Sequence, residues 1–217
     1  MRNKKRGYQY IEINCEFYYW ETKCTKAIKP IFPALEVQQG DEEGGLAFDQ
    51  RELLKSGKLT DFRINARDGQ QFSCHKLLLA ARSPVFERML ASGMAESAGN
   101  EMTLTDLSPT TIADMLAYIY TDTVQNLAEK ARDLLPAAEK YQLVGLKNKC
   151  STALLKEIKL ETAVDLAMLA DLYGVKDLRE AALRFIVNNK VHYQGDSAWQ
   201  ETFKSNPSLL FETWKLF

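Results

Sequence analysis

The sequence predicts an α+β protein, in which a small sheet flanked by helices is followed by a short all-helical segment. Around the tight-turn pair Asp68-Gly69, apolar and polar side chains alternate, with Phe62 and Ile64 before the turn and Phe72 after it. Such alternation on both sides of a turn predicts a β-hairpin. After His75 the apolar residues recur at helical spacing, and from residue 160 onward all the spacings are helical.

The overall composition narrows the classes of function. The chain has 217 residues, enough for one domain or two small ones, with 28 Lys and Arg against 29 Asp and Glu. This balance indicates no nucleic-acid partner, and no apolar run approaches the ~20 residues of a membrane span. The four cysteines lie far apart and are interpreted as reduced thiols. With two histidines in the chain, we expect no metal and no other cofactor.

The first 45 residues carry no recognised domain. Residues 1–25 are rich in aromatic side chains, and residues 26–45 contain two prolines and the run QQGDEEGG, which predicts a linker. The basic residues at 2–6 fit either a nuclear import signal or a solvated basic end, and the second interpretation is favoured.

Residues 46–57 predict a helix that stops at Gly57. Leu46, Leu53 and Leu54 lie at i, i+7 and i+8, so they share one face. That face either packs on the helix's own core or meets a second subunit. Gln50 places a polar side chain on the same face.

Local signals predict where the next elements begin. Ser83-Pro84 and Ser108-Pro109 each combine a capping serine with a proline at the first helical position. Between His75 and Ser83, residues 77–80 are continuously apolar and predict a short buried helix. Met102 and Leu104 alternate with polar residues and predict a strand.

The second half of the chain is predicted to be helical. Asn126 is expected to cap a helix in which Pro136 removes one backbone donor, so we expect a kink or restart near Leu135. Residues 143–157 predict another helix. Tyr173-Gly174 separates the last two expected helices within residues 160–187.

One group of residues invites a catalytic interpretation, namely Asp61, Cys74, His75 and Lys76. A nucleophilic Cys–His pair needs side chains that converge from different elements, whereas neighbours on one strand point to opposite faces. We therefore predict that the chain is not an enzyme and that Asp61 and His75 satisfy buried polar groups. An enzyme that uses Cys74 and His75 is kept as an alternative.

Several separated motifs resemble the BTB/POZ domain, a dimerising protein-interaction fold, and within it the speckle-type POZ protein group of cullin-3 ubiquitin-ligase adaptors. The resemblance covers residues 46–217. The domain signature consists of Asp61, His75-Lys76, Leu79-Ala80, Ser83 and Phe86. The group is indicated by LAARSPVF, Met94-Ala95-Glu96-Ser97, Tyr118-Ile119-Tyr120-Thr121, Asp133-Leu134-Leu135, Lys140-Tyr141 and Leu169-Ala170-Asp171-Leu172.

This resemblance implies a BTB domain over residues 46–157 and a 3-box with a short BACK segment over residues 158–217. It implies a homodimer, or a heterodimer with related BTB proteins, in which the first helix crosses to the partner subunit. The dimer interface would contain Leu46, Leu53 and Leu54, and the structural signature would contain Asp61, His75 and Lys76. The terminal aromatic residues 211–217 are expected either to form a second self-association surface or to pack on their own domain.

The resemblance also implies an adaptor that binds cullin-3 in an E3 ubiquitin ligase complex, in the nucleus or the cytoplasm. Met94 and Glu96 match the hydrophobic–any–Glu motif that the family places against cullin-3, and the helices of residues 160–187 would extend that contact. The group recruits substrates through a β-sandwich domain before the BTB domain, for which 45 residues are too few. The alternative is a BTB module that only dimerises, as a transcriptional scaffold or a competitor of longer relatives.

Overall fold

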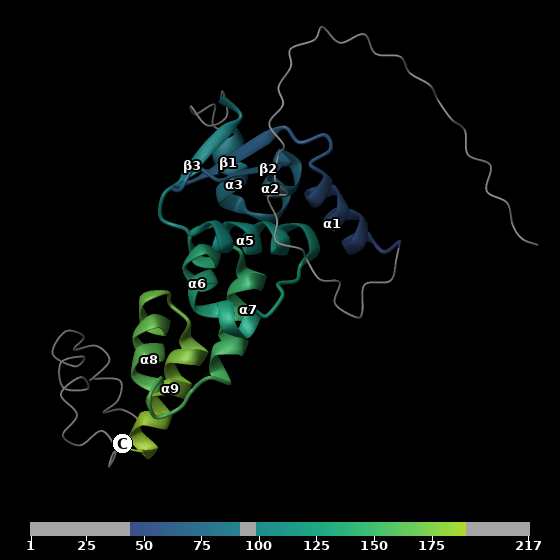
Figure 1. Ribbon diagram of the computed structural model, residues 1–217. Coiled ribbons are helices and arrows are strands. Elements are labelled where there is room, and N and C mark those ends of the chain that lie inside the picture. Colours follow the sequence, from purple (N-terminus) through teal and green to yellow (C-terminus); the bar gives the residue numbers. More distant parts are fainter. Residues whose placement is uncertain (1–43, 92–98, 190–217) are drawn as a thin grey trace, which may run out of the picture. The chain divides into compact units, whose positions relative to one another are not determined.

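The structure, a computed structural model, describes residues 44–91 and 99–189 of the chain (Figure 1). It confirms the α+β class. In chain order the elements are α1 (Leu46–Ser56), β1 (Phe62–Ala66), β2 (Gln71–Cys74), α2 (Lys76–Arg82), α3 (Pro84–Ala91), β3 (Glu101–Leu104), α5 (Pro109–Thr121), α6 (Leu127–Lys140), α7 (Val144–Leu155), α8 (Ala163–Leu172) and α9 (Lys176–Asn188).

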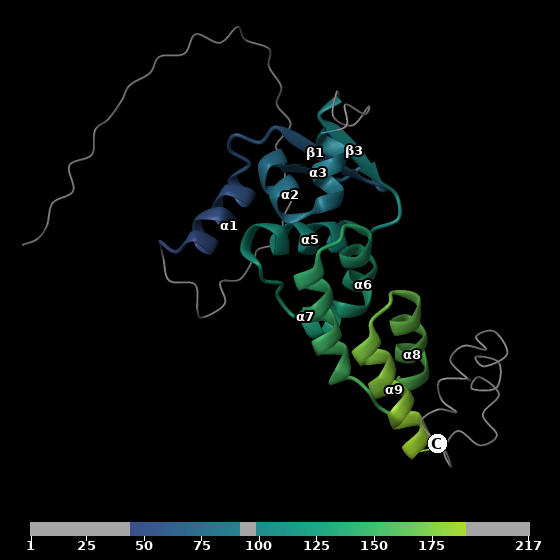
Figure 2. The same cartoon turned by 180° about the vertical axis from the view of Figure 1, so that it is seen from behind.

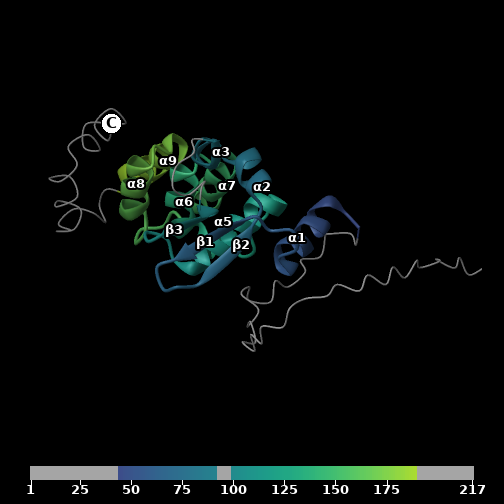
Figure 3. The ribbon, with the colours of Figure 1, turned by 90° about the horizontal axis from the view of Figure 1, so that it is seen from above.

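The three strands form one sheet in the order β2-β1-β3, which Figure 3 shows from above. β1 runs antiparallel to β2 and parallel to β3, and the chain passes through α2 and α3 between β2 and β3. The register places Ile64 opposite both Phe72 and Met102, and all three side chains are buried. The predicted hairpin is confirmed, and the apolar positions of its alternation are the buried face of the sheet.

The hairpin turn has the backbone that its residue types predict. Gly69 has a φ of 88°, a left-handed conformation that glycine adopts without a steric penalty. The Asp68 side chain accepts a hydrogen bond of 3.0 Å from the backbone N–H of Gln70, which closes the turn.

Both Ser-Pro pairs cap helices, as predicted. The Ser83 hydroxyl accepts a hydrogen bond from the Phe86 N–H at 3.2 Å in the first turn of α3. The Ser108 hydroxyl accepts one from the Thr111 N–H at 3.1 Å in the first turn of α5. Asn126 occupies the N-cap position of α6 but makes no side-chain capping bond, so the expected cap is wrong in its chemistry. Its backbone is left-handed, with a φ of 51°.

Helix α5 lies between the sheet with α2 and α3 and the α6–α7 pair, as Figures 1 and 2 show from opposite sides. Helices α1, α2 and α6 contact it. Ile112, Met115 and Leu116 are fully buried and join one hydrophobic core with Ile64 and Phe72 of the sheet. The side chains predicted to form the buried face of this helix are therefore the centre of the core.

The sequence predicts a kink or restart near Leu135. The restart is wrong, because α6 is one continuous helix from Leu127 to Lys140 with Pro136 inside it, and the kink stays a prediction. Leu135 and Ala137, on either side of the proline, are fully buried. Apolar burial around this turn offsets the backbone hydrogen bond that proline cannot donate.

Helix α2 is only partly buried, which corrects the expectation for residues 77–80. Leu79 is inaccessible to solvent, whereas Leu77 is 78% exposed. Residues two positions apart on a helix point about 200° apart, so a short helix that rests on one face cannot bury both.

The last two helices follow the predicted spacing, with Gly174 (φ 62°) between them. Leu166 of α8 and Leu178 of α9 join the main core, and α9 also contacts α7. A second cluster lies between the two helices and contains Ala163, Ala182 and Ile186. The hydrophobic core therefore continues past residue 158.

Candidate protein-interaction site

The signature residue Asp61 connects the start of the sheet to the start of α2. Its carboxylate accepts a hydrogen bond of 2.8 Å from the Lys76 backbone N–H, the first residue of α2. The antiparallel register brings the two ends together, since Phe62 pairs with Cys74. A carboxylate at a helix N-terminus satisfies a free N–H and stabilises the helix dipole.

His75 makes hydrogen bonds through both ring nitrogens. Nε2 lies 2.8 Å from the Lys58 carbonyl oxygen, and Nδ1 lies 2.7 Å from the Tyr120 hydroxyl. A carbonyl oxygen can only accept, so Nε2 carries the proton and Nδ1 accepts the hydroxyl proton of Tyr120. The same hydroxyl accepts the His75 backbone N–H at 2.9 Å, and burial raises the pKa of Tyr120.

The chemistry of Cys74 does not support the enzymatic alternative. Burial, and then the charge of Asp61, raises the pKa of its thiol to about 12. The thiol lies 3.6 Å from the Phe62 carbonyl oxygen, while both ring nitrogens of His75 are bonded elsewhere. A nucleophilic cysteine needs a lowered pKa or an adjacent base, and this cysteine has neither. The signature residues Asp61, His75 and Lys76 thus have structural contacts.

The part of the chain that the structure describes contains neither a cluster of metal ligands nor a membrane-spanning helix. Among residues 44–91 and 99–189, no group of three His, Cys, Asp or Glu side chains is placed to hold a metal ion. Within these ranges, every helix is too short or too polar to span a bilayer.

The leucines predicted for the dimer interface differ in exposure. Leu46 is 73% exposed, Leu53 is half-buried, and Leu54 is buried in the core of its own chain. A partner subunit can therefore reach Leu46 and part of Leu53 but not Leu54. The assignment of this helix to a dimer interface stays a prediction.

Sequence reasoning missed Leu77, which is exposed on α2. Helices α1 and α2 both pack on α5, and each presents a leucine to solvent. The continuous apolar run at 77–79 suggested full burial, whereas a seven-residue helix on a core surface has an outer side.

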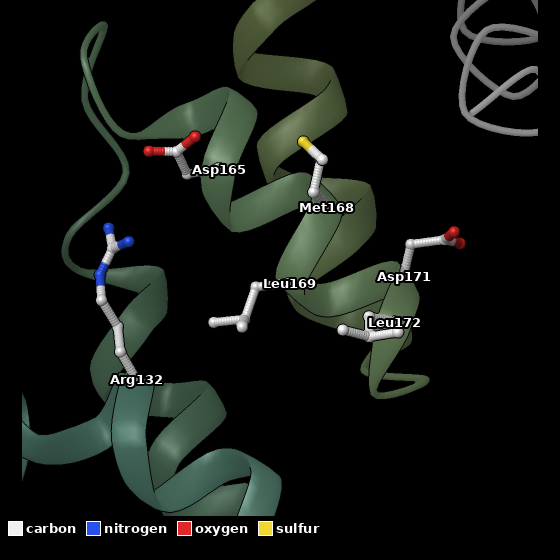
Figure 4. Close-up of a pocket in the computed structure, with 6 residues that line it drawn as sticks. All are labelled: Arg132, Asp165, Met168, Leu169, Asp171 and Leu172. Atoms are coloured by element: carbon white, nitrogen blue, oxygen red, sulfur yellow. The ribbon is translucent and has the colours of Figure 1, made fainter. Parts of the chain in front are cut away.

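A groove of about 460 Å³ separates α6 from α8, and Figure 4 shows its lining residues. Met168, Leu169 and Leu172 supply its apolar part from α8. Leu172 is 73% exposed, and Met168 is 36% exposed. The exposure of Leu172 and Met168 follows from their positions on the helix, because the buried side of α8 is made by Ala163, Leu166, Ala167 and Ala170. Helix α8 is apolar on more than one side, which is typical of a helix that packs against two neighbours.

Charged side chains surround this apolar part of the groove. The Arg132 guanidinium from α6 points toward the loop before α8 and the Asp165 side of the groove (Figure 4). Its Nε lies 3.6 Å from the Glu157 carboxylate. Asp171 is paired with Arg179 at 2.8 Å. An apolar centre with a charged rim is the usual composition of a protein interface.

The two residues predicted to contact cullin-3, Met94 and Glu96, lie outside the described residues. They follow α3, which ends at Ala91, in the sequence. The basic residues at 2–6, the linker at 26–45 and the aromatic run at 211–217 also lie outside them.

Comparison with known proteins identifies the class. Residues 51–158 match the family model of the BTB/POZ domain, and the chain belongs to the BTB/POZ family. It is therefore a protein-interaction module. BTB domains are generally non-catalytic and commonly form dimers.

Among individual proteins, the chain is similar to "TD and POZ domain-containing protein 3" of Mus musculus. The two are 37% identical over 169 residues, which make up 77% of this chain and 46% of the relative. The chain thus spans about half the length of the relative it matches. The solved BTB domain of zebrafish PATZ1 aligns with 51% of this chain and 88% of that domain, at 23% identity and a TM-score of 0.44.

We predict that Cys74 and Cys150 react slowly with thiol reagents in the folded chain at pH 8. Burial raises the pKa of each to about 12, so the thiolate fraction is about a thousandfold below that of an ordinary cysteine. Mass mapping of alkylated peptides, with and without guanidinium, measures the difference. Rapid alkylation of Cys74 in the folded chain would contradict its structural assignment.

The same raised pKa values determine how the two thiols affect stability. The folded pKa of each thiol exceeds the ordinary value of 9.0. The stabilisation that each protonated thiol contributes to the free energy of unfolding is therefore complete below pH 9 and is lost as the pH rises toward 12.

Proposed function

We propose that this chain is a dimeric BTB adaptor that binds cullin-3 in an E3 ubiquitin ligase complex, without catalysis of its own. The observation that carries the proposal is the exposed apolar pair Met168 and Leu172 on α8, which line the groove together with Arg132 of α6. In the group that the sequence resembles, this helix pair extends the cullin contact beyond the BTB core. Two exposed apolar side chains one helical turn apart supply an apolar contact surface, and covering it with a partner removes that surface from water.

The contact would combine this groove with the segment after α3. Met94 supplies an adaptable apolar side chain there and Glu96 a charged acceptor, which together suit a helical partner. The proposed cullin contact therefore has two parts, the groove lined by α8 and the segment after α3, and each part has its own test below.

Self-association is the second part of the proposal. Leu46 and Leu77 would lie in the contact between two copies, each on a helix that α5 supports. Burying a leucine side chain contributes roughly 1.5–3 kcal/mol, so the exposed pair supports a dimer. The polar Gln50 lies on the same helix as Leu46, and it would weaken a contact made by α1 alone.

A BTB module that dimerises without binding cullin-3 is the alternative, as a transcriptional scaffold or a competitor of related proteins. The exposure of Leu46 and Leu77 supports it, because self-association through those residues requires no cullin. A cullin-3 pull-down with the whole chain separates the two functions.

We predict that Leu46→Asp together with Leu77→Asp converts a dimer into a monomer. Both side chains are more than two-thirds exposed in the single chain, so the change should leave the fold intact while the dimer weakens at least about a hundredfold. Light scattering after gel filtration measures the mass. Val144→Asp is the matched control, because Val144 is 67% exposed and lies on α7. A monomeric unmodified chain at micromolar concentration would contradict the dimer.

We predict that Leu172→Asp weakens cullin-3 binding by about tenfold or more, because a carboxylate at the centre of an apolar contact must lose its hydration. Calorimetry with the amino-terminal part of cullin-3 measures the affinity. The melting temperature should stay within about a degree or two of the parent, since Leu172 is 73% exposed. Val144→Asp again serves as control, and equal affinities for the two variants would remove the groove from the site.

We predict that Met94→Ala together with Glu96→Ala also reduces the affinity for cullin-3 by about tenfold or more. Circular dichroism should be unchanged, and Ser97→Ala, at the adjoining position outside the motif, should bind as the parent does. Unchanged affinity of the double variant would exclude Met94 and Glu96 from the cullin-3 contact. The groove is tested separately, by Leu172→Asp.

A further inference from the structure

The chain contains two Ser-Pro pairs, Ser83-Pro84 and Ser108-Pro109, and no Thr-Pro pair. The structure gives the two serines opposite environments. Ser83 is fully buried, and its hydroxyl donates to the Tyr141 carbonyl oxygen at 2.6 Å. Ser108 is exposed, and its backbone is extended, with a φ of −69° and a ψ of 154°. Its hydroxyl accepts the Thr111 N–H and lies 2.8 Å from the hydroxyls of Thr110 and Thr111, so an enzyme at the surface reaches it by displacing these local contacts. The Ser83 hydroxyl could be reached only by opening the core.

The surroundings of Ser108 can accept additional negative charge. Ser108 and Arg67 line the same surface depression of about 490 Å³. Arg67 is exposed and forms no ion pair with another residue of the described ranges. Asp106, in the same depression, is already paired with Lys140 at 2.8 Å, and hydrogen bonding to that ammonium lowers its pKa. Asp68 also lines the depression, and its carboxylate accepts the Gln70 N–H at 3.0 Å. Arg67 is the basic side chain of this lining that can pair with a new anion.

We propose that Ser108 is a phosphorylation site for a proline-directed serine/threonine kinase. The Ser108 oxygen attacks the γ-phosphorus of magnesium-bound ATP, and its proton passes to the catalytic base of the kinase. A new Ser–O–P bond forms, the bond from the γ-phosphorus to the bridging β–γ oxygen breaks, and ADP leaves. Pro109 supplies the residue that this class of kinase requires after the acceptor serine, and Ser108 is exposed and has an extended backbone.

The modified side chain would strengthen the start of α5. A phosphoserine carries about −1.5 to −2 charges at pH 7 and three acceptor oxygens. Next to the first N–H groups of a 13-residue helix, this charge is stabilising, and Arg67 can form a charge-assisted hydrogen bond with it. The modification is thus expected to preserve the fold and to change the charge of one surface.

The test uses the whole chain, a mitogen-activated protein kinase, magnesium and ATP, with intact-mass and peptide-mass readouts. We expect one phosphate, on Ser108, and none on Ser83. Ser108→Ala should abolish it, and Pro109→Ala should slow it by about tenfold or more with the hydroxyl retained. The phosphorylated chain should melt at a higher temperature than the unmodified one, and Arg67→Ala should reduce that increase.

The control substrate is a synthetic peptide of residues 103–113. If the kinase modifies the peptide but leaves Ser108 of the folded chain unmodified, the proposal is wrong. A phosphate that appears on Ser83 instead, or one on Ser108 that lowers the melting temperature, overturns it as well.

Discussion

The hydroxyl of Tyr120 joins three parts of the fold. It accepts the backbone N–H of His75 and donates to the ring of the same residue, whose other nitrogen donates to the Lys58 carbonyl oxygen. Tyr120 belongs to α5, His75 lies between β2 and α2, and Lys58 lies in the turn after α1. These bonds hold the sheet, α2 and the end of α1 in place over the central helix.

The junction depends on complete pairing, because Tyr120 is almost fully buried. A buried hydroxyl without a partner costs about 1–3 kcal/mol. The Asp61 carboxylate completes the junction by pairing with the first N–H of α2. Asp61 and His75 therefore contribute side chains where a strand becomes a helix, whereas Lys76 contributes its backbone N–H.

A second junction ties the other end of α2 to the helices that follow. Asp122 ends α5 in a left-handed conformation, and its carboxylate binds Arg82 of α2 and Lys149 of α7. Partial burial by itself would raise the pKa of Asp122, but hydrogen bonds from Lys149, Arg82 and Tyr118 together lower it below its ordinary value. Ser83 adds a buried bond to the Tyr141 carbonyl oxygen at the end of α6. Each polar contact connects elements that are distant in sequence.

The sequence allowed the sheet, the helix positions and the two serine caps to be predicted, because each rests on a local pattern. Pairings between distant residues, such as Asp122 with Arg82 and Lys149, leave no local pattern and could not be predicted. Pro136 was misjudged for the same reason, since the burial that offsets its missing donor comes from tertiary packing. Local patterning indicates which side chains are apolar, but not how many of them the fold can cover.

The candidate groove arises where α8 has more apolar side chains than the fold covers. Helix α8 fills its contacts with the core and with α9 mainly through alanines and Leu166. Small side chains allow close packing, so the larger Met168 and Leu172 remain exposed, while Leu169 points toward α6 (Figure 4). The neighbouring charges are mostly balanced within the chain, Asp171 by Arg179 and Arg132 by Glu157. A partner that enters the groove would therefore gain apolar burial without having to neutralise a strongly charged rim.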